Sequence, residues 1–169
     1  MKTRTSHPIR TLALNAAALI ALSSTTAAVA GDAHHVGMDW KDNFLTRLCA
    51  RQFEIAQRMD MESFRDYDAE TFRAVHDERA ITVFGSGATR IGIDAIMATF
   101  ASHFANREAQ WSWTERYRVV DGCSSAYILY ETVYEIPRIG FRSHALTGVT
   151  YTYDRGKWLA ISDQGTPLP

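Results

Sequence analysis

The sequence predicts an α+β domain in which helices come first and a mainly antiparallel sheet follows. Between residues 42 and 105, apolar side chains recur every three or four positions, the period of an amphipathic helix. Beyond residue 110, apolar and polar side chains alternate, and turn sequences separate the alternating runs. Because no helical pattern lies between these runs, the chain does not follow the alternating strand–helix order of a parallel sheet.

The first thirty residues have the layout of a secretory signal peptide. A basic start precedes the apolar stretch "TLALNAAALIALSS", and residues 28–30 (AVA) form a small-x-small cleavage site. An uncleaved anchor is the alternative, because about 20 apolar residues can span a bilayer. Asn15 and the Ser/Thr cluster at 23–26 favour cleavage. We therefore expect an exported protein, periplasmic or secreted, with no stable membrane association after cleavage.

The remaining chain has the length of one domain, predicted at 42–166 after a flexible lead-in at 31–41. The full sequence has 18 Lys and Arg against 19 Asp and Glu, and residues 1–30 hold three of the basic residues and no acidic one. The mature chain therefore carries 15 basic and 19 acidic side chains, a net charge of −4. This balance argues against nucleic acid or an anionic membrane as a partner.

Three helices and one strand are predicted before residue 110. The helices are "DNFLTRLCARQFEIAQRMD" (42–60), "DAETFRAVH" (68–76) with Asp68 as N-cap, and "IDAIMATFASHFA" (93–105). The short apolar run "AITVF" (80–84) is predicted to be a strand.

The glycine-rich stretch "FGSGATRIG" (84–92) follows this strand and precedes a helix, as phosphate-binding loops do. A dinucleotide-binding loop needs a glycine at its sixth position, and Arg90 stands there instead. No lysine follows for a P-loop. We therefore predict a tight corner that uses glycine's access to positive φ, with "ATRIG" as a further edge strand.

Four runs are predicted to form an antiparallel meander: 111–120, 123–136, 143–154 and 157–163. Asp121-Gly122 and Asp154-Arg155-Gly156 are hairpin turns, and "PRIGFRS" (137–143) is a longer loop. We pair Val120 with Cys123 and Ile136 with His144. A slip of one residue at the longer loop would exchange the faces beyond it.

One face of the meander is apolar enough to be covered by the helices and to enclose a pocket. With the pairing above, Gly148 lies opposite Asp163 on this face and leaves space above that carboxylate. The face contains Trp111, Trp113, Glu115, Tyr117, Ile128, Tyr130, Thr132, Tyr134, His144, Leu146, Gly148, Thr150, Leu159, Ile161 and Asp163.

The opposite face mixes apolar and charged side chains. Its apolar members are Leu129, Val133, Val149, Tyr151 and Trp158. An antiparallel sheet that is apolar on both sides needs a second cover, and the helices are already used on the first face. A second copy of the chain is the economical cover, so we predict a homodimer through this outer face.

The two cysteines, Cys49 and Cys123, fit no metal-site spacing. Export makes a disulfide chemically possible, but a bridge requires Cα atoms within about 7 Å. A domain of this size does not need such a link, so we expect two unpaired thiols. We expect no metal and no cofactor.

The chain resembles the NTF2-like superfamily, in particular its SnoaL-like branch. The resemblance rests on "ARQFEIAQRMD", "DAETFRAVHDERAITVFGSGATRIGIDAIMATFASHF", the strand pair around "VVDG" and the closing "GKWLAISDQGTPL", and it covers about residues 42–166. It implies a cone-shaped α+β barrel with three N-terminal helices packed on a strongly curved sheet, an internal pocket and usually a dimer. Members include ketosteroid isomerases, polyketide cyclases, dehydratases, epoxide hydrolases and non-catalytic modules, so the fold does not select a reaction.

Asp163 is the leading candidate for catalysis, because the resemblance implies an acid–base carboxylate on the last strand. A carboxylate in an apolar pocket has a raised pKa and can shuttle a proton; an end-of-strand aspartate bonded to a backbone turn is the alternative. Tyr130 is the candidate oxyanion donor. Ser162 and Gln164 flank Asp163 where many relatives carry histidine, which argues against a histidine scheme.

Five side chains are predicted to bind the substrate: Phe53, Trp113, Glu115, Tyr117 and His144. Trp111 and Trp113 would stack on a flat ligand, with core packing as their alternative. Glu115 would be a second acid, or else an ion-pair partner. His144 would titrate near neutral pH, or else be a surface histidine.

Two other histidines are predicted to lie outside the site. His76 would complement a helix C-terminus, and His103 would be solvated.

We predict a cofactor-free isomerase, cyclase or dehydratase that moves a proton at a carbon of a small carbonyl compound. The alternative is a non-catalytic module for small-molecule binding or dimerisation.

Overall fold

The computed structural model describes residues 44–169. The predicted signal peptide (1–30) and lead-in (31–41) lie outside the described residues. No helix within 44–169 is both long and apolar enough to cross a membrane.

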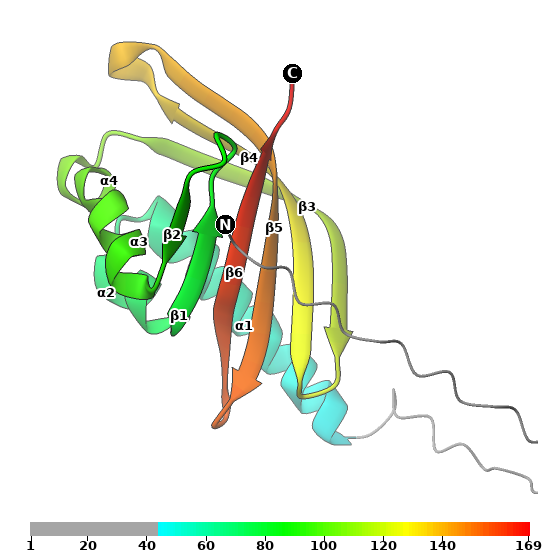
Figure 1. The fold of residues 1–169 in the computed structure, drawn as a ribbon. Helices are drawn as coiled ribbons and strands as arrows, with labels where there is room; N and C mark the ends of the chain where they lie inside the picture. Colours follow the sequence, from blue (N-terminus) through cyan, green and yellow to red (C-terminus); the bar gives the residue numbers. More distant parts are fainter. Residues whose placement is uncertain (1–43) are drawn as a thin grey trace, which may run out of the picture. The chain divides into compact units, whose positions relative to one another are not determined.

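The chain forms its helices first and its long antiparallel strands afterwards, as predicted (Figure 1). The elements are α1 Phe44–Arg65, α2 Ala69–Ala74, β1 His76–Val83, β2 Thr89–Ile91, α3 Ile93–Thr99, α4 Ala101–Asn106, β3 Gln110–Asp121, β4 Ser125–Ile136, the 3₁₀ turn η2 Pro137–Ile139, β5 Phe141–Asp154 and β6 Lys157–Pro167.

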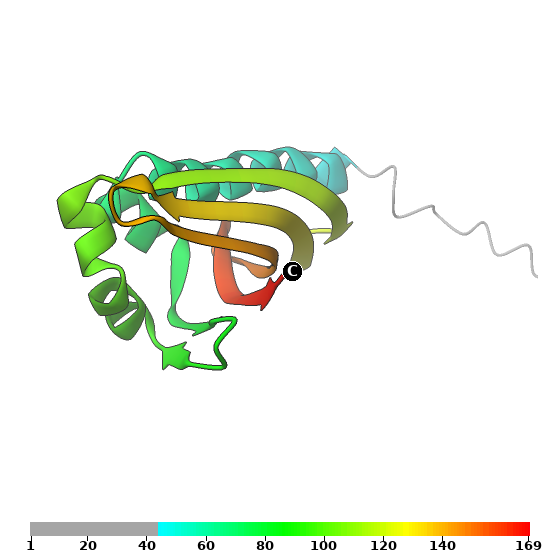
Figure 2. The same ribbon diagram turned by 90° about the horizontal axis from the view of Figure 1, so that it is seen from above.

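The six strands form one open, strongly curved sheet in the order β2-β1-β6-β5-β4-β3 (Figure 2). All neighbours are antiparallel except β1 and β6, which are parallel. The predicted meander is therefore β3 to β6, and the predicted additional strands are β1 and β2. The α+β class and the curved, mainly antiparallel sheet are confirmed, although the sheet does not close into a barrel.

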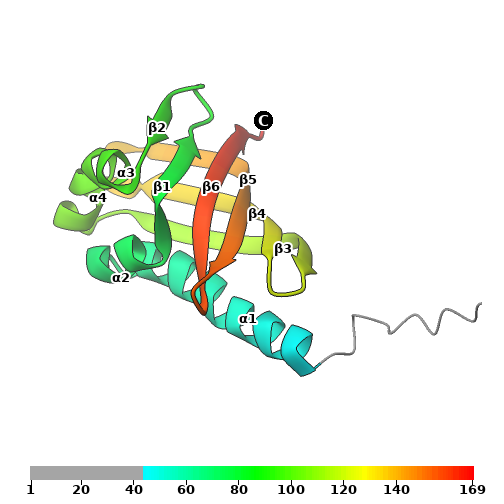
Figure 3. The same cartoon turned by 60° about the horizontal axis from the view of Figure 1, so that its bottom comes forward.

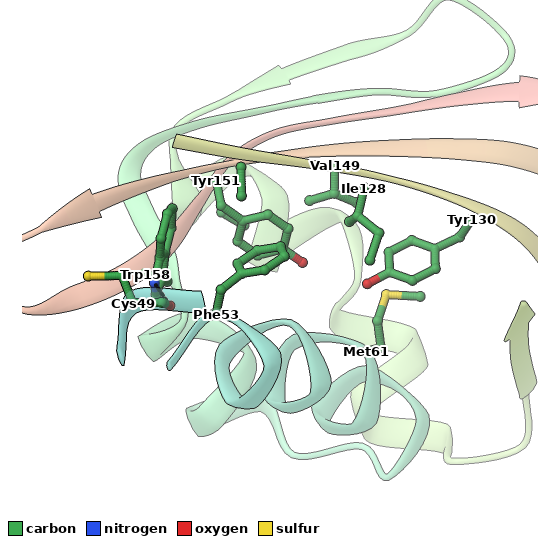
Figure 4. Close-up of a cluster of buried hydrophobic side chains, with 10 residues drawn as sticks. Cys49, Phe53, Met61, Ile128, Tyr130, Val149, Tyr151 and Trp158 are labelled. Carbon is green, nitrogen blue, oxygen red and sulfur yellow. Dashed lines mark hydrogen bonds between the residues drawn. The ribbon is translucent and has the colours of Figure 1, made fainter. Parts of the chain in front are cut away.

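Helix α1 runs across the strands, while α2, α3 and α4 gather beside β1 and β2 (Figures 1 and 3). The apolar stripe of α1 packs on the inner face of the sheet, where Phe53 is 0% exposed. The ring centroid of Phe53 lies 5.1 Å from that of Tyr151 and 5.2 Å from that of Trp158, with the rings edge to face (Figure 4). Such pairs add about 0.5–1.5 kcal/mol to the burial of apolar area.

The predicted third helix is broken at Phe100, which ends α3 and begins α4. Phe100 and Phe104 pack against a second core cluster that includes Phe64 and Phe72. His103 on α4 is also buried and stacks on Phe64 at 3.9 Å between ring centroids, so the prediction of a solvated His103 is wrong.

The glycine-rich stretch is a corner between the antiparallel strands β1 and β2. The Phe84 N–H donates to the Ala88 carbonyl, and Gly87 has a φ of 83°. The chain reverses there without a parallel strand to follow, which agrees with the sequence interpretation.

Two strand pairings differ from the predicted ones. Ile136 pairs with Phe141 instead of His144, so β5 presents its other set of side chains to the helices. His144 therefore lies on the outer face, and Val149 lies inside. Val120 pairs with Ala126 instead of Cys123, which turns Tyr117 outward, and a bulge between Glu115 and Tyr117 then returns Glu115 to the side of Tyr130. The register of β5 against β4 depends on the 3₁₀ turn η2 in the loop between them. The alternation of side chains in the sequence does not predict this turn.

Asp163 still lies on the inner face, because a bulge between Thr150 and Tyr151 shifts β6 back. Asp163 pairs with Val149, and Gly148 pairs with Gln164. The predicted space above Asp163 at Gly148 is therefore wrong. A Cβ on Gly148 would lie 2.5 Å from the Tyr127 hydroxyl, so this glycine makes room for a tyrosine.

Cys49 and Cys123 form a disulfide with a Cα–Cα distance of 5.3 Å. The expectation of two unpaired thiols is wrong. The β3–β4 hairpin places Cys123 against α1, although 74 positions separate the cysteines. The sequence could not reveal this proximity.

The outer face is less apolar than predicted. Val149, Tyr151 and Trp158 were assigned to it, but all three are at most 3% exposed in the core. Leu129 and Val133 remain on the outer side of β4, opposite the inner set of Ile128 and its alternating neighbours. The homodimer remains a prediction.

Candidate functional site

A cavity lies between the inner face of the sheet and the helices, and it has two adjoining lobes. The larger has a volume of about 350 Å³ and the smaller about 100 Å³. Both lobes are bordered by Phe64, Phe100, Trp111, Thr147 and Asp163. Asp163 is therefore at their junction and can contact a molecule in either lobe.

Aromatic rings form much of the cavity wall. The ring centroid of Phe64 lies 5.0 Å from that of Phe100 and 5.5 Å from those of Phe72 and Trp111. These rings come from α1, α2, β3 and the break between α3 and α4, so the wall requires the assembled fold. An apolar wall with a few polar groups is typical of small-molecule sites.

Asp163 is the carboxylate shared by the two lobes. Its Oδ2 accepts a hydrogen bond from Thr82 Oγ1 at 2.8 Å, since the parallel strands β1 and β6 place these residues side by side. Its Oδ1 has no hydrogen-bond donor among residues 44–169. Burial raises the pKa of Asp163 to about 6, while the Thr82 bond and the nearby His76 act in the opposite direction.

A second carboxylate, Asp60, borders the smaller lobe from α1 and is 5% exposed. The Tyr151 hydroxyl donates to Asp60 Oδ2 at 2.6 Å. Asp60 Oδ1 lies 3.8 Å from Nε2 of His76, the first residue of β1. Burial, followed by the charge of Asp60, raises the pKa of Tyr151, which keeps its hydroxyl protonated as the donor.

The orientation of His76 follows from its backbone contact. The Phe72 carbonyl lies 2.7 Å from His76 Nδ1 and can only accept, so Nδ1 carries the hydrogen. Nε2 is therefore the nitrogen that faces Asp60 in the smaller lobe. The sequence predicts His76 only as a complement to a helix C-terminus. Its position beside Asp60 was not predicted.

His103 borders the larger lobe with both ring nitrogens engaged. Nε2–H donates to the Phe64 carbonyl at 2.7 Å, and the Tyr134 hydroxyl lies 3.1 Å from Nδ1 and donates to it. Burial lowers the pKa of His103, so the ring is neutral at pH 7. We interpret it as a structural histidine that fixes α4.

Of the predicted site residues, Asp163 and Trp111 border the cavity and the others do not. Tyr130 is 1% exposed in the core (Figure 4). Its hydroxyl donates to Gln57 Oε1 at 2.5 Å. Phe53 is a core residue. Trp113 packs at the edge of the same core beneath the Arg65 guanidinium, 5.6 Å from the ring centroid.

The three remaining predicted residues lie away from the cavity. Glu115 is exposed and accepts two hydrogen bonds from Arg118 at 2.7 and 2.9 Å. Tyr117 is 56% exposed. His144 Nε2 lies 2.8 Å from a Glu131 carboxylate oxygen on the outer face. The structure therefore does not bring these residues together with Asp163.

Asp60 was not singled out from the sequence and His76 was predicted only as a structural residue, although Asp60 left a signal. It stands seven positions after Phe53 and four before Phe64, within the apolar stripe of α1. An acidic residue within a buried stripe marks either an ion pair or a functional site. His76 left no comparable signal, because the sequence pattern extends the second helix through it.

No group of three or more metal-binding side chains occurs within residues 44–169. No family model matches the sequence, and no curated protein matches it.

Solved structures with similar folds define the class of this protein. A protein of unknown function with a cystatin-like fold from Nostoc punctiforme has a TM-score of 0.61 and 16% identity over 73% of this chain and 80% of its own. An NTF2-like protein of unknown function from Shewanella oneidensis has a TM-score of 0.59 and 11% identity over 69% of this chain and 98% of its own. A putative calcium/calmodulin-dependent protein kinase type II association domain from Thiobacillus denitrificans has a TM-score of 0.58 and 15% identity, covering 69% and 94%.

The cavity, the curved sheet and these similarities together define an α+β protein of the cystatin-like type. More specifically, the chain has the NTF2-like fold, as its sequence predicts. At these identities the likeness concerns the fold, and the chemistry of the site must be argued from the residues that border it.

Proposed function

We propose that this domain binds a small, mainly apolar carbonyl compound in the cavity and that Asp163 removes a proton from a carbon next to the carbonyl group. The position of Asp163 carries the proposal. One of its oxygens is held by Thr82, the other lacks a donor within residues 44–169, and both lobes border it. The substrate would occupy the larger lobe, whose volume of about 350 Å³ lies within the usual range for ligand pockets.

The pKa of about 6 suits this role. At pH 7 a carboxyl group with this pKa is about nine-tenths ionised, so the base is present in its active form. It is also a stronger base than an ordinary aspartate, because the same burial that raises its pKa increases its affinity for a proton.

We also propose that the protein is exported from the cytoplasm and that it is related to the SnoaL-like branch. The disulfide between Cys49 and Cys123 supports export, because such bonds persist mainly in oxidising compartments. Dimerisation through the outer face of the sheet is supported by the exposed side chains of Tyr117 and Val119 on β3.

Exchange of carbon-bound hydrogen tests the proposed base. The protein is incubated in D₂O with phenylacetone, and deuterium uptake next to the carbonyl group is followed by NMR. We expect uptake above the buffer rate, reduced by about 10²–10⁴-fold in Asp163→Asn. Asp154→Asn, at the exposed end of β5, is the matched control and should leave the rate unchanged. Equal rates for wild type and Asp163→Asn would refute the assignment.

Non-catalytic binding is the second candidate, favoured by the position of Tyr130. The predicted oxyanion donor lies in the core and does not border the cavity. A wild-type protein that binds phenylacetone without deuterium uptake, with affinity retained in Asp163→Asn, would support a binding module.

A further inference from the structure

The smaller lobe contains a buried polar network that the proposed base does not use. Asp60, His76 and Tyr151 each have most of their surface buried, and they link α1, β1 and β5. Burying a carboxylate beside an imidazole gives little net stability compared with apolar packing. A polar network that replaces apolar packing at a cavity wall therefore indicates a functional site.

His76 is the member of the network that can exchange a proton with a ligand. Its Nδ1–H is committed to the Phe72 carbonyl, whereas Nε2 lies beyond hydrogen-bond distance from Asp60 Oδ1, at 3.8 Å. His103, the other buried histidine within residues 44–169, has hydrogen bonds at both ring nitrogens, so neither nitrogen is available to a ligand.

Three further groups define the surroundings of His76. Asp60 faces it from α1, and the Tyr151 hydroxyl from β5 holds the Asp60 carboxylate in place. Asp163 on β6 borders the same lobe, and its charge interacts with those of His76 and Asp60. His76 therefore shares the smaller lobe with two carboxylates, Asp60 and Asp163.

We infer that His76 is a general acid that works opposite Asp163, with Asp60 as its positioning residue, and that the reaction eliminates water from a β-hydroxy carbonyl compound. The inference rests on the proposed function, and it selects dehydration from among isomerisation, cyclisation and dehydration.

The step balances without a co-reactant. The Asp163 carboxylate takes the proton from the carbon next to the carbonyl group, and the electrons of that C–H bond form the C=C bond. The C–O bond at the β carbon breaks and its electron pair leaves with oxygen. Nε2–H of His76 gives its proton to that oxygen, and water departs. Asp163 returns its proton to solvent and His76 regains one, so the enzyme is unchanged.

The two lobes have the sizes that this reaction needs. The carbonyl compound occupies the larger lobe, and its hydroxyl group points past Asp163 into the smaller one. A water molecule takes about 30 Å³ of liquid volume, so the smaller lobe of about 100 Å³ accommodates the leaving water beside His76.

The test separates the two proton transfers with one probe, 4-hydroxy-4-phenylbutan-2-one. Its dehydration product, 4-phenylbut-3-en-2-one, is conjugated and is followed by ultraviolet absorbance. Deuterium uptake next to the carbonyl group is measured by NMR on the unreacted probe. Uptake requires the base alone, whereas elimination requires the base and the acid.

We expect wild type to catalyse both processes. His76→Gln should lose elimination by about 10²–10⁴-fold and keep its deuterium uptake within about threefold. His144→Gln, on the outer face, is the control and should change neither rate. Asp60→Asn should lower kcat for elimination with little change in KM, and long-range ¹H–¹⁵N NMR should show an altered hydrogen distribution over the His76 nitrogens. A purely structural role for Asp60 would leave that distribution unchanged in the folded variant.

Each result bears on one of the two proposals. Undiminished elimination by His76→Gln, or wild-type uptake without elimination, overturns the assignment of His76 while Asp163 stands as base. If a folded His76→Gln variant loses both deuterium uptake and elimination, the assignment of His76 as the acid is also overturned, because His76 would then be needed for the action of Asp163 as base. Absence of uptake in wild type overturns the proposed function, and the dehydration with it. If His76→Gln does not fold, Asp60→Asn provides the same comparison of elimination against uptake.

Discussion

Removal of the Cys49–Cys123 disulfide should destabilise the domain strongly, and the structure gives the size of the effect. The cysteines are 74 positions apart in sequence. In the chain-entropy treatment, a closed loop of this length restricts the unfolded state by about 4 kcal/mol at 25 °C. Domains of this kind have total stabilities of about 5–15 kcal/mol, so the bond would supply a large share.

The assay is thermal and urea unfolding of wild type, Cys123→Ala and the double variant Cys49→Ala/Cys123→Ala, followed by circular dichroism. A loss of about 4 kcal/mol corresponds to a decrease in Tm of about 10–20 °C for a domain of this size. Wild type in reducing buffer should match Cys123→Ala. The double variant should add only the small cost of trimming buried Cys49, because either change breaks the same bond.

Two results would refute this reasoning. Two titratable thiols in the protein purified from an oxidising compartment would show that the bond does not form. A verified bond whose loss costs less than about 1 kcal/mol would show that the unfolded chain is already restricted between α1 and the β3–β4 turn.

Two further predictions concern the buried carboxylates. Because the pKa of Asp163 is raised in the folded state from an ordinary value of 3.8 to about 6, the folded protein binds this proton more tightly than the unfolded chain does. Its ionisation therefore costs up to about 3 kcal/mol above pH 6, and the cost disappears as the pH falls towards 4. Asp163→Asn should be more stable than wild type at pH 8 and lose this advantage at pH 4, as measured by urea unfolding; a constant difference between the two proteins would contradict the shift. Tyr151→Phe removes the donor to Asp60 Oδ2 and should destabilise the protein by about 1.5–3 kcal/mol at pH 7, since a buried carboxylate loses a hydrogen bond. A loss below about 0.5 kcal/mol would show that Asp60 finds another partner.

The secondary structure was predictable because it follows from local periodicity. The stripe of α1 and the alternation of β3 to β6 are visible in the sequence, and so is the turn chemistry of the glycine-rich corner. The breaks were not predictable: Phe100 ends α3 because its ring joins an aromatic cluster made by α1 and α2, and the sequence pattern continues straight through it.

The sequence predicts the inner face for Asp163 correctly only because two errors in strand register cancel each other. The loop between β4 and β5 exchanges the faces of β5, and the bulge between Thr150 and Tyr151 exchanges them again before Asp163. Tyr117 and His144 are each affected by one error only: Val120 pairs with Ala126 instead of Cys123, and Ile136 pairs with Phe141 instead of His144, so each lies on the opposite face. Alternation thus assigns a face reliably only until the next bulge.

The polar network of the smaller lobe shows why site prediction failed where fold prediction succeeded. Asp60 and Tyr151 are 91 positions apart, yet their contact positions the carboxylate that faces His76. Helix α1 carries both this carboxylate and Cys49, eleven residues or about 16 Å apart along the helix. The disulfide at one end and the Tyr151 bond further along therefore hold α1 against the sheet at two points. The same helix supplies Phe64 to both lobes, so the attachment of α1 determines the shape of the cavity as well as the stability of the core.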